Sequence, residues 1–334
     1  MKVVAIGRTE ILYSSILEVK KSGHEINLII TCDEAPHYLK GADDFQSLAE
    51  KLGAEFIKTE HIDNAEIIAT LSKINPDIAI SVNWKTIIPP KVLECFKYGI
   101  VNAHAGDLPR YRGNAVPNWA IINGENEIVL TLHFMIPELD AGPILLQRRC
   151  PIKHDTRIGE IYDFLRKNYP QMFAEVLDGL EKGTISPREQ PSDSSLTLRC
   201  YPRLPRDNEI DWTQPAIQID RLVRAVSEPF DGAYTFLGSE KLIIWRAHCA
   251  SSPSPFLGVP GQVAQRYPGT GEVAVITGDG FLTLKEIEIG SQGRMKATQA
   301  IKSAKVRLGM HITEEIIELK RRVTELEKRN GMRK

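Results

Sequence analysis

Short apolar runs alternate with amphipathic stretches along residues 3–82. Four of the runs predict buried strands, and three stretches between them have helical spacing. The strands are expected at 3–6, 26–31, 55–58 and 77–82, and the helices at 10–22, 44–52 and 64–74. Strands that alternate with helices indicate βαβ units joined by right-handed crossovers. We therefore expect an α/β fold with a Rossmann-like, mostly parallel sheet and helices on both faces.

The pattern changes beyond this region. Residues 98–101 predict one more strand, and residues 129–135 alternate strictly between two faces, one of which carries His133. Apolar residues at helical spacing then predict a long helix over 156–181. We expect this helix to close the first domain, at residue 185.

The second half is divided by turn residues. Prolines at 187, 191, 202 and 205 predict a linker over 186–205. Beyond it, a short amphipathic helix and several brief strands separated by glycines indicate a small, OB-like β-barrel domain over 206–305. The helix is expected at 216–227 and the strands at 233–237, 241–247, 273–277 and 281–289.

The last segment predicts a helix over 311–330. Its apolar residues alternate spacings of four and three, which forms an a/d seam of about two heptads. The seam residues are Ile312, Ile316, Leu319, Val323 and Leu326. Residues 302–334 also hold ten Lys and Arg against five Asp and Glu. Three interpretations stay open, which are a helix packed on its own domain, an intersubunit coil in a homodimer and, least favoured, a contact with nucleic acid.

Composition excludes several classes of protein. The chain has 334 residues, 42% hydrophobic and 25% charged, and a net charge of −1, so it lacks the strong basic field usual in nucleic-acid binders. No run of 18 apolar residues predicts a membrane span, and the first residues predict a strand rather than a signal peptide. Its five cysteines are widely spaced without a CxxC pair, so we expect a reduced, cytoplasmic protein with no metal site.

The most informative stretch is 101–113, which reads Val-Asn-Ala-His-Ala-Gly-Asp-Leu-Pro-Arg-Tyr-Arg-Gly. Asn102 and His104 are two residues apart, so an extended chain directs both to the same side, at the end of a parallel strand where such sheets form their crevices. Asn114 is a candidate N-cap for the next helix. A further acid, Asp140, precedes Gly142 in a predicted tight loop.

These motifs resemble the folate-dependent formyltransferase family. The resemblance rests on Asn-x-His at 102–104, Leu-Pro-x-x-x-Gly at 108–113 and Leu-Asp-x-Gly at 139–142, and it covers residues 1–185. The second domain, with its motifs at 208–212 and 229–233, is similar to that of the longer members, the methionyl-tRNA formyltransferases and the sugar-nucleotide N-formyltransferases. The resemblance implies 10-formyltetrahydrofolate as the co-substrate.

Formyl transfer to an amine assigns a role to each candidate. His104 suits the general base, because the pKa of histidine is ordinarily about 6.5. The Asn102 amide can donate to the oxyanion of a tetrahedral intermediate. Asp140 can orient His104 and stabilise its protonated form, or hold a water that relays protons to the leaving nitrogen.

The resemblance also implies a folate site, lined by the segment before the catalytic strand and by the loop of Asp140. The residues are Asn83, Trp84, Lys85, Ile87, Ile88, Pro89, Glu138, Leu139, Ala141 and Gly142. Trp84 has two interpretations, an aromatic that stacks near the ligand and one that packs at a strand end.

This chain departs from the family at two positions. It has Gly106-Asp107 where many members have Ser-Leu. Asp107 is a candidate to bind the cationic amine or, alternatively, to cap a turn. Arg110 and Arg112 are candidates to contact a phosphate or the glutamate tail of the folate. The alternative is that both side chains are simply exposed to solvent. His133 is expected to be a structural residue of the sheet face.

Several functions compete with this interpretation. A dinucleotide-dependent oxidoreductase is rejected, because the first turn has one glycine where the fingerprint needs three. A hydrolase that passes the formyl group to water would use the same triad. Among acceptors we favour a nucleotide-linked amino sugar, with Arg203 and Arg206 as further phosphate ligands. Methionyl-tRNA is the alternative, since a near-neutral chain fits a polyanion less well, and an amino-acid amine stays open.

Overall fold

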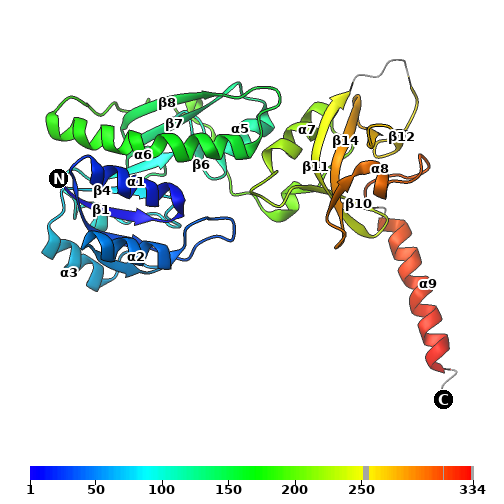
Figure 1. The fold of residues 1–334 in the computed structure, drawn as a ribbon, viewed down its shortest axis with the longest axis horizontal. Coiled ribbons are helices and arrows are strands. Elements are labelled where there is room, and N and C mark those ends of the chain that lie inside the picture. The colour runs from blue at the N-terminus through cyan, green and yellow to red at the C-terminus, as the bar shows by residue number, and fades with distance from the viewer. Residues whose placement is uncertain (251–255, 311, 332–334) are drawn as a thin grey trace. The chain divides into compact units, whose positions relative to one another are not determined.

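The computed structural model describes residues 1–250, 256–310 and 312–331 (Figure 1). The chain forms two compact units, Met1–Arg203 and Leu204–Lys334, which are described separately. No helix among the described residues has the length and apolar character needed to span a bilayer.

The first unit is built on one seven-stranded sheet. Its elements are β1 (Lys2–Gly7), α1 (Thr9–Lys21), β2 (Glu25–Thr31), α2 (Ala42–Leu52), β3 (Glu55–Lys58), α3 (Ala65–Ile74), β4 (Ile78–Val82), α4 (Pro90–Leu93), β5 (Ile100–His104), β6 (Arg112–Gly113), α5 (Val116–Asn123), β7 (Glu127–Phe134), β8 (Ile144–Pro151), α6 (Ile158–Lys182), a 3-10 turn (Ser194–Leu196) and β9 (Arg199–Cys200). The strand order is β3-β2-β1-β4-β5-β7-β8, parallel from β3 to β5 and antiparallel from β5 to β8. The mostly parallel sheet is therefore confirmed.

Helices cover both faces of this sheet. Val4 and Ile6 point to one face, where they pack in a buried cluster with Ile67 and Leu71 of α3. The alternate residues of β1 point to the opposite face. There α1 and α6 lie side by side (Figure 1). Strands buried on both faces explain why their sequences are unbroken apolar runs.

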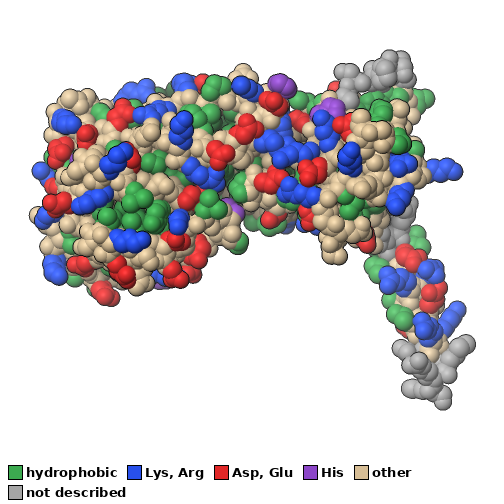
Figure 2. All heavy atoms as spheres, viewed as in Figure 1, with side chains coloured by type: hydrophobic (Ala, Val, Ile, Leu, Met, Phe, Trp, Pro, Cys, Tyr) green, Lys and Arg blue, Asp and Glu red, His purple; other side chains and the backbone are tan. Residues whose placement is uncertain are grey.

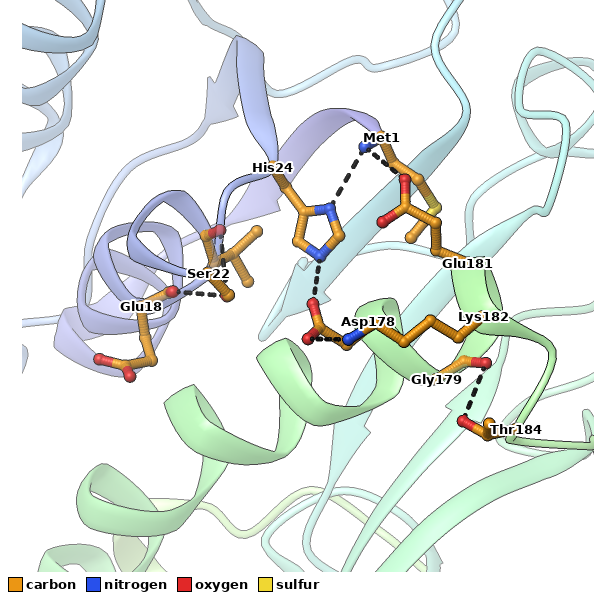
Figure 3. A network of polar contacts seen from close by, with 10 residues as sticks. Met1, Glu18, Ser22, His24, Asp178, Gly179, Glu181, Lys182 and Thr184 are labelled. Atoms are coloured by element: carbon orange, nitrogen blue, oxygen red, sulfur yellow. Dashed lines mark hydrogen bonds and ion pairs between the residues drawn. The ribbon is translucent and has the colours of Figure 1, made fainter.

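A polar network fixes the start of the chain to α6 (Figure 3). The Met1 amino group lies 3.3 Å from His24 Nδ1 and 3.2 Å from Glu181 Oε1. His24 Nε2 lies 3.0 Å from Asp178 Oδ1 of the same helix. His24 is buried, so its ring bridges β1 and α6 with both nitrogens in use.

Residues 186–203, expected to be part of a linker, belong to the first unit. Arg188 pairs through its backbone with Ile144 of β8, and β9 pairs in parallel with β6. Proline-rich composition correctly indicates that this segment lacks a long regular element. Composition does not predict the backbone pairing with distant residues that positions the segment in the first unit.

The second unit is an antiparallel sheet with short helices. Its elements are a 3-10 turn (Pro205–Asn208), α7 (Ala216–Ala225), β10 (Ala233–Leu237), β11 (Glu240–Ala250), β12 (Val263–Tyr267), β13 (Glu272–Ile276), β14 (Phe281–Ile289), β15 (Arg294–Lys296), α8 (Ala297–Ala300) and α9 (Ile312–Gly331). The strand path is β10-β11-β14-β13-β12, and β15 pairs with β14. The small β domain and the C-terminal helix are as predicted, whereas β12, β15 and α8 were not predicted.

The apolar seam of α9 is exposed. Ile316, Leu319, Val323 and Leu326 are each about half exposed, at 46–56%. The side chain of Ile312, the fifth residue of the predicted seam, lies outside the described residues. The structure therefore differs from the interpretation in which α9 packs its seam on its own domain.

Candidate active site

Asn102 and His104 lie at the carboxyl end of β5, where the sheet changes from parallel to antiparallel. Their positions two apart direct both side chains to one face. The antiparallel register then sets His133 of β7 opposite Asn102 and Thr131 opposite His104. The site thus combines polar side chains from two neighbouring strands.

His104 is held by the loop that follows it. Its Nε2 lies 2.6 Å from the carbonyl oxygen of Tyr111, and because a carbonyl only accepts, Nε2 carries the proton. The Tyr111 hydroxyl donates to Glu125 over 2.6 Å, which anchors the far end of that residue. In a neutral imidazole, Nδ1 is then free to accept a proton.

Asp140 completes the cluster. Its Oδ2 lies 3.5 Å from His104 Nδ1 and accepts the backbone N–H of Gly113 over 2.8 Å. Gly113 has φ +105° and a Cβ there would lie 2.2 Å from the Cys200 carbonyl oxygen, so only glycine fits. The predicted proximity of His104 and Asp140 is therefore what the structure shows.

His133 is a member of the cluster that the sequence analysis left as a structural residue. Its Nδ1 donates to the Phe134 carbonyl over 2.8 Å, so Nε2 is the accepting nitrogen of the neutral ring. Nε2 lies 3.3 Å from Asn102 Nδ2 and 3.6 Å from Asp140 Oδ1. Strand alternation identified its face, whereas its partner became visible only with the register of β5 and β7.

Gln190 was also missed, and it holds the loop of Asp140 in place. Its Nε2 donates to the carbonyl oxygens of Asp140 and Gly142 over 2.9 and 2.7 Å, and its Oε1 accepts from Arg112 over 2.6 Å. No local sequence signal marks this role, because Gln190 lies in the proline-rich segment.

Burial and charge set the ionisation of the site. Burial lowers the pKa of His104, and the Asp140 carboxylate only partly offsets this, so the ring is neutral near pH 7. Burial alone would raise the pKa of Asp140. The two imidazoles and the Gly113 N–H outweigh it and hold that pKa well below its usual range. The site therefore pairs a neutral base with a carboxylate.

Backbone conformations that side chains rarely adopt gather around this site. Asn83, Tyr111, Ala115 and Asp140 all have positive φ, at 53°, 60°, 52° and 49°. Such conformations cost about 1–3 kcal/mol each and persist where the surrounding structure enforces them. They are typical of sites in which geometry is kept for function.

A cavity of about 340 Å³ opens beside the cluster. Seven of the ten predicted folate-site residues line it, which are Asn83, Trp84, Lys85, Ile87, Ile88, Glu138 and Leu139. Thr86, Met135, Ile136 and Pro137 line it too and were not predicted. A mixed apolar and polar cavity of this size is typical of a small-molecule site.

The other predicted site residues lie elsewhere. Pro89 is the N-cap of α4, and Ala141 and Gly142 do not line the cavity. Asp107 lies 3.8 Å from Arg149, and Arg110 pairs with Glu125 over 3.0 Å. Their binding roles, like that of Arg112, stay predictions.

Asn114 is not the N-cap of the following helix, as the sequence had suggested. The α5 helix begins at Val116, its N-cap is Ala115, and no side chain caps it. The Asn114 backbone N–H instead donates to Cys200 over 3.0 Å. Pairing with β9 thus delays the start of the helix, and Asn114 lines the cavity.

A smaller cavity of about 150 Å³ is also lined by His104. Both are lined by His104 and by four other residues, Asn83, Ala103, Gly113 and Asn114. The smaller one is otherwise largely apolar and aromatic, with Ile11, Leu165, Tyr162 and Tyr169 from α1 and α6. Two molecules can therefore meet at His104.

This geometry defines a class of protein. A base that takes up a proton stands beside an amide that can stabilise an oxyanion, at the strand end where open α/β sheets bind ligands. That combination is typical of an enzyme that transfers an acyl group from one molecule to another.

Comparisons with known proteins identify the family. Residues 1–177 match the family described as Formyl transferase, and residues 204–305 match the Formyl transferase C-terminal domain. Since the first match alone covers more than half of the chain, the chain belongs to the formyl transferase family. It is accordingly an N-formyltransferase, and the resemblance predicted from the motifs is confirmed.

Individual relatives and solved structures are of three kinds. A methionyl-tRNA formyltransferase from Citrifermentans bemidjiense is 31% identical over 92% of this chain and 95% of its own length. Among solved structures, the sugar 3N-formyltransferase WlaRD has a TM-score of 0.61 at 18% identity, covering 88% of this chain and 99% of that one. HypX from Aquifex aeolicus, solved with tetrahydrofolic acid, has a TM-score of 0.56 at 19% identity over 91% of this chain, which spans 47% of HypX.

Proposed function

We propose that this enzyme transfers the formyl group of 10-formyltetrahydrofolate to a primary amine at the cluster of Asn102, His104, His133 and Asp140. The observation that carries the proposal is that His104 lines both cavities. The folate co-substrate supplies the formyl group, and the residues of the larger cavity would hold it. The amine would then approach from the smaller one.

His104 acts as the base in this proposal. Its Nε2 proton is committed to the Tyr111 carbonyl, so Nδ1 is the nitrogen that accepts a proton from the attacking amine. Once protonated, Nδ1 faces the Asp140 carboxylate, 3.5 Å away, which stabilises the imidazolium. The Gly113 N–H donates to the Asp140 carboxylate, and this hydrogen bond favours the ionised form.

Asn102 stabilises the negative charge that develops on the formyl oxygen. One Nδ2 hydrogen donates to His133 Nε2, which leaves the second hydrogen for the oxygen. A single preorganised donor of this kind is worth roughly 3 kcal/mol in comparable sites. His133 is thus a positioning residue for Asn102.

The acceptor is the finer part of the proposal. Methionyl-tRNA has the better support, because relatives of that name align over nearly the whole chain at 29–31% identity. The sequence alone had favoured a nucleotide-linked amino sugar over methionyl-tRNA, so the order of the two acceptors is now reversed.

A nucleotide-linked amino sugar remains the second candidate because of charge. The first unit carries 23 Lys and Arg against 27 Asp and Glu, and acidic and basic side chains are interspersed on the face in Figure 2. A polyanionic tRNA is expected to bind a more basic surface. WlaRD, which shares the fold, was solved with dTDP and a formyl folate.

The test compares the two acceptors directly. Release of tetrahydrofolate from 10-formyltetrahydrofolate is followed with charged initiator methionyl-tRNA and, separately, with a panel of amino-sugar nucleotides. Turnover with either establishes formyl transfer to an amine and identifies the acceptor class. Release of formate at the same rate with no acceptor present would instead indicate a hydrolase.

A further inference from the structure

Two arginines lie side by side next to the active site. The two-residue strands β6 and β9 pair in parallel, with Arg112 directly opposite Arg199. Neither guanidinium forms an ion pair with a carboxylate of the described residues. Arg112 Nη2 donates to the Gln190 amide, and its buried Nε has no hydrogen-bond partner in the described part of the chain.

This arrangement indicates a site for an anion. Like charges directly opposite each other destabilise a strand pair, and a buried donor without a partner costs about 1–3 kcal/mol. An anion held between the two guanidiniums would remove the first of these costs. Arg199 lines the larger cavity, and Gly113, which follows Arg112, lines both cavities, so the anion would lie where an acceptor in the smaller cavity can reach it.

Two aromatic rings, one on the segment of Arg199 and one from α5, lie next to these charges. Tyr201 is 67% exposed, and the Arg199 guanidinium lies 5.5 Å from its ring centroid. Trp119 Nε1 donates to the Tyr201 carbonyl over 2.9 Å, and the Arg203 guanidinium lies 5.0 Å from the Trp119 ring. An exposed ring beside guanidinium groups is suited to stack on a nucleobase whose phosphate the arginines bind.

We propose that Arg112, Arg199, Tyr201 and Trp119 form a nucleotide subsite, which binds the acceptor through a phosphate and a base while its amine reaches His104. The proposal rests on the proposed formyl transfer and adds how the acceptor is recognised. The guanidiniums bind the phosphate oxygens, and Tyr201 stacks on the base. Trp119 fixes the Tyr201 backbone.

Both classes of acceptor would present a nucleoside phosphate to this subsite. A nucleoside diphosphate carries it in an amino-sugar acceptor, and the 3′-terminal nucleotides carry it in a tRNA. Titration calorimetry on the full chain with UDP, dTDP and a CCA trinucleotide distinguishes these sources. We expect one of the three to bind at least tenfold more tightly than inorganic phosphate, since the base adds stacking.

Substitutions locate the binding. Arg199→Gln and Tyr201→Ala are each expected to weaken the binding of that ligand about tenfold or more, and to raise the KM of the acceptor by a similar factor while kcat changes less than threefold. The control is Arg148→Gln, because Arg148 is neutralised by Glu175 over 2.6 Å. This variant is expected to bind the nucleotide as the wild type does.

The outcomes separate this proposal from the proposed function. If no nucleotide binds more tightly than phosphate, or if Arg199→Gln and Tyr201→Ala both bind as the wild type does, the subsite is wrong. Formyl transfer to an amine would stand in that case. If nucleotides bind as expected and no formyl transfer occurs, the proposed function fails while the subsite stands.

Discussion

Asn102 and His133 face each other across the antiparallel strands β5 and β7, with Asn102 Nδ2 3.3 Å from His133 Nε2. The contact fixes the orientation of an amide whose second hydrogen is the donor in the proposed mechanism. A strand register therefore sets the geometry of the proposed oxyanion donor. The same register sets His104 opposite Thr131, whose hydroxyl donates to the Gly106 carbonyl over 2.7 Å in the loop that follows.

Replacement of His133 is expected to lower kcat and leave folate affinity nearly unchanged. We predict that His133→Leu lowers kcat about 10- to 100-fold, because Asn102 loses the acceptor that orients it. His133→Gln is the matched control, since its amide oxygen can accept from Asn102 and restore part of the rate. Steady-state kinetics with both variants measures this, and equal kcat for His133→Leu and the wild type contradicts the positioning role.

The pH dependence of kcat is expected to report His104. In the proposed mechanism the neutral form of His104 is the base, and burial lowers its pKa below the ordinary value of about 6.5. Activity is therefore present at neutral pH and is lost as the pH falls through this lowered pKa. A profile of kcat at saturating acceptor should show its acid limb below about 6.5. An acid limb centred above pH 7 would contradict the assignment.

Gln190 is expected to act through the loop of Asp140. Gln190→Ala removes two donors to the carbonyls of that loop and the acceptor of Arg112. We expect kcat to fall about tenfold, because a carboxylate displaced by even 1 Å orients its base poorly. Gln190→Glu keeps the acceptor for Arg112 and loses both donors, so it should resemble Gln190→Ala. If Gln190→Glu has the wild-type kcat, the donors do not hold the loop.

The α9 helix is expected to pair with a second copy of the chain. Its described seam has the β-branched Ile316 and Val323 at a positions and Leu319 and Leu326 at d positions, which favours two parallel strands. In that register, Arg322 at a g position meets Glu327 at the partner's e position, with opposite charge.

Substitution of the seam tests this pairing. The double variant Leu319→Gln and Leu326→Gln is expected to halve the mass measured by light scattering. Thr324→Gln, on the outer side of the same helix, serves as the control and should keep the mass of the wild type. The same mass for the double variant and the wild type contradicts pairing through α9.

The strands β1, β2 and β4 were predictable because burial on both faces makes them nearly continuous apolar runs, whereas β8 was not predicted. By contrast, β6 and β9 have two residues each, too few for any periodicity, and their pairing joins residues 112–113 to residues 199–200. The exposed residues of β12 likewise conceal its strand pattern. Short and edge elements depend on tertiary pairing, which local sequence does not encode.

The site shows the same division. Asn102 and His104 were predictable, because two residues on one strand share a face whatever the rest of the fold does. His133, Gln190 and Arg199 contribute through a strand register or a backbone pairing that joins distant segments. Arg110 pairs with Glu125, a contact that the sequence did not indicate, and its binding role stays a prediction.

The central claim is that His104 is the base in formyl transfer to an amine. Single-turnover transfer of labelled formyl from 10-formyltetrahydrofolate to the acceptor, with the wild type and with His104→Asn, tests it most directly. We predict that His104→Asn binds folate as the wild type does and transfers formyl at least a hundredfold more slowly. A general base typically contributes about 10²- to 10⁴-fold to the rate, so a larger loss would mean that other steps change too. Transfer by His104→Asn within tenfold of the wild-type rate would contradict the account.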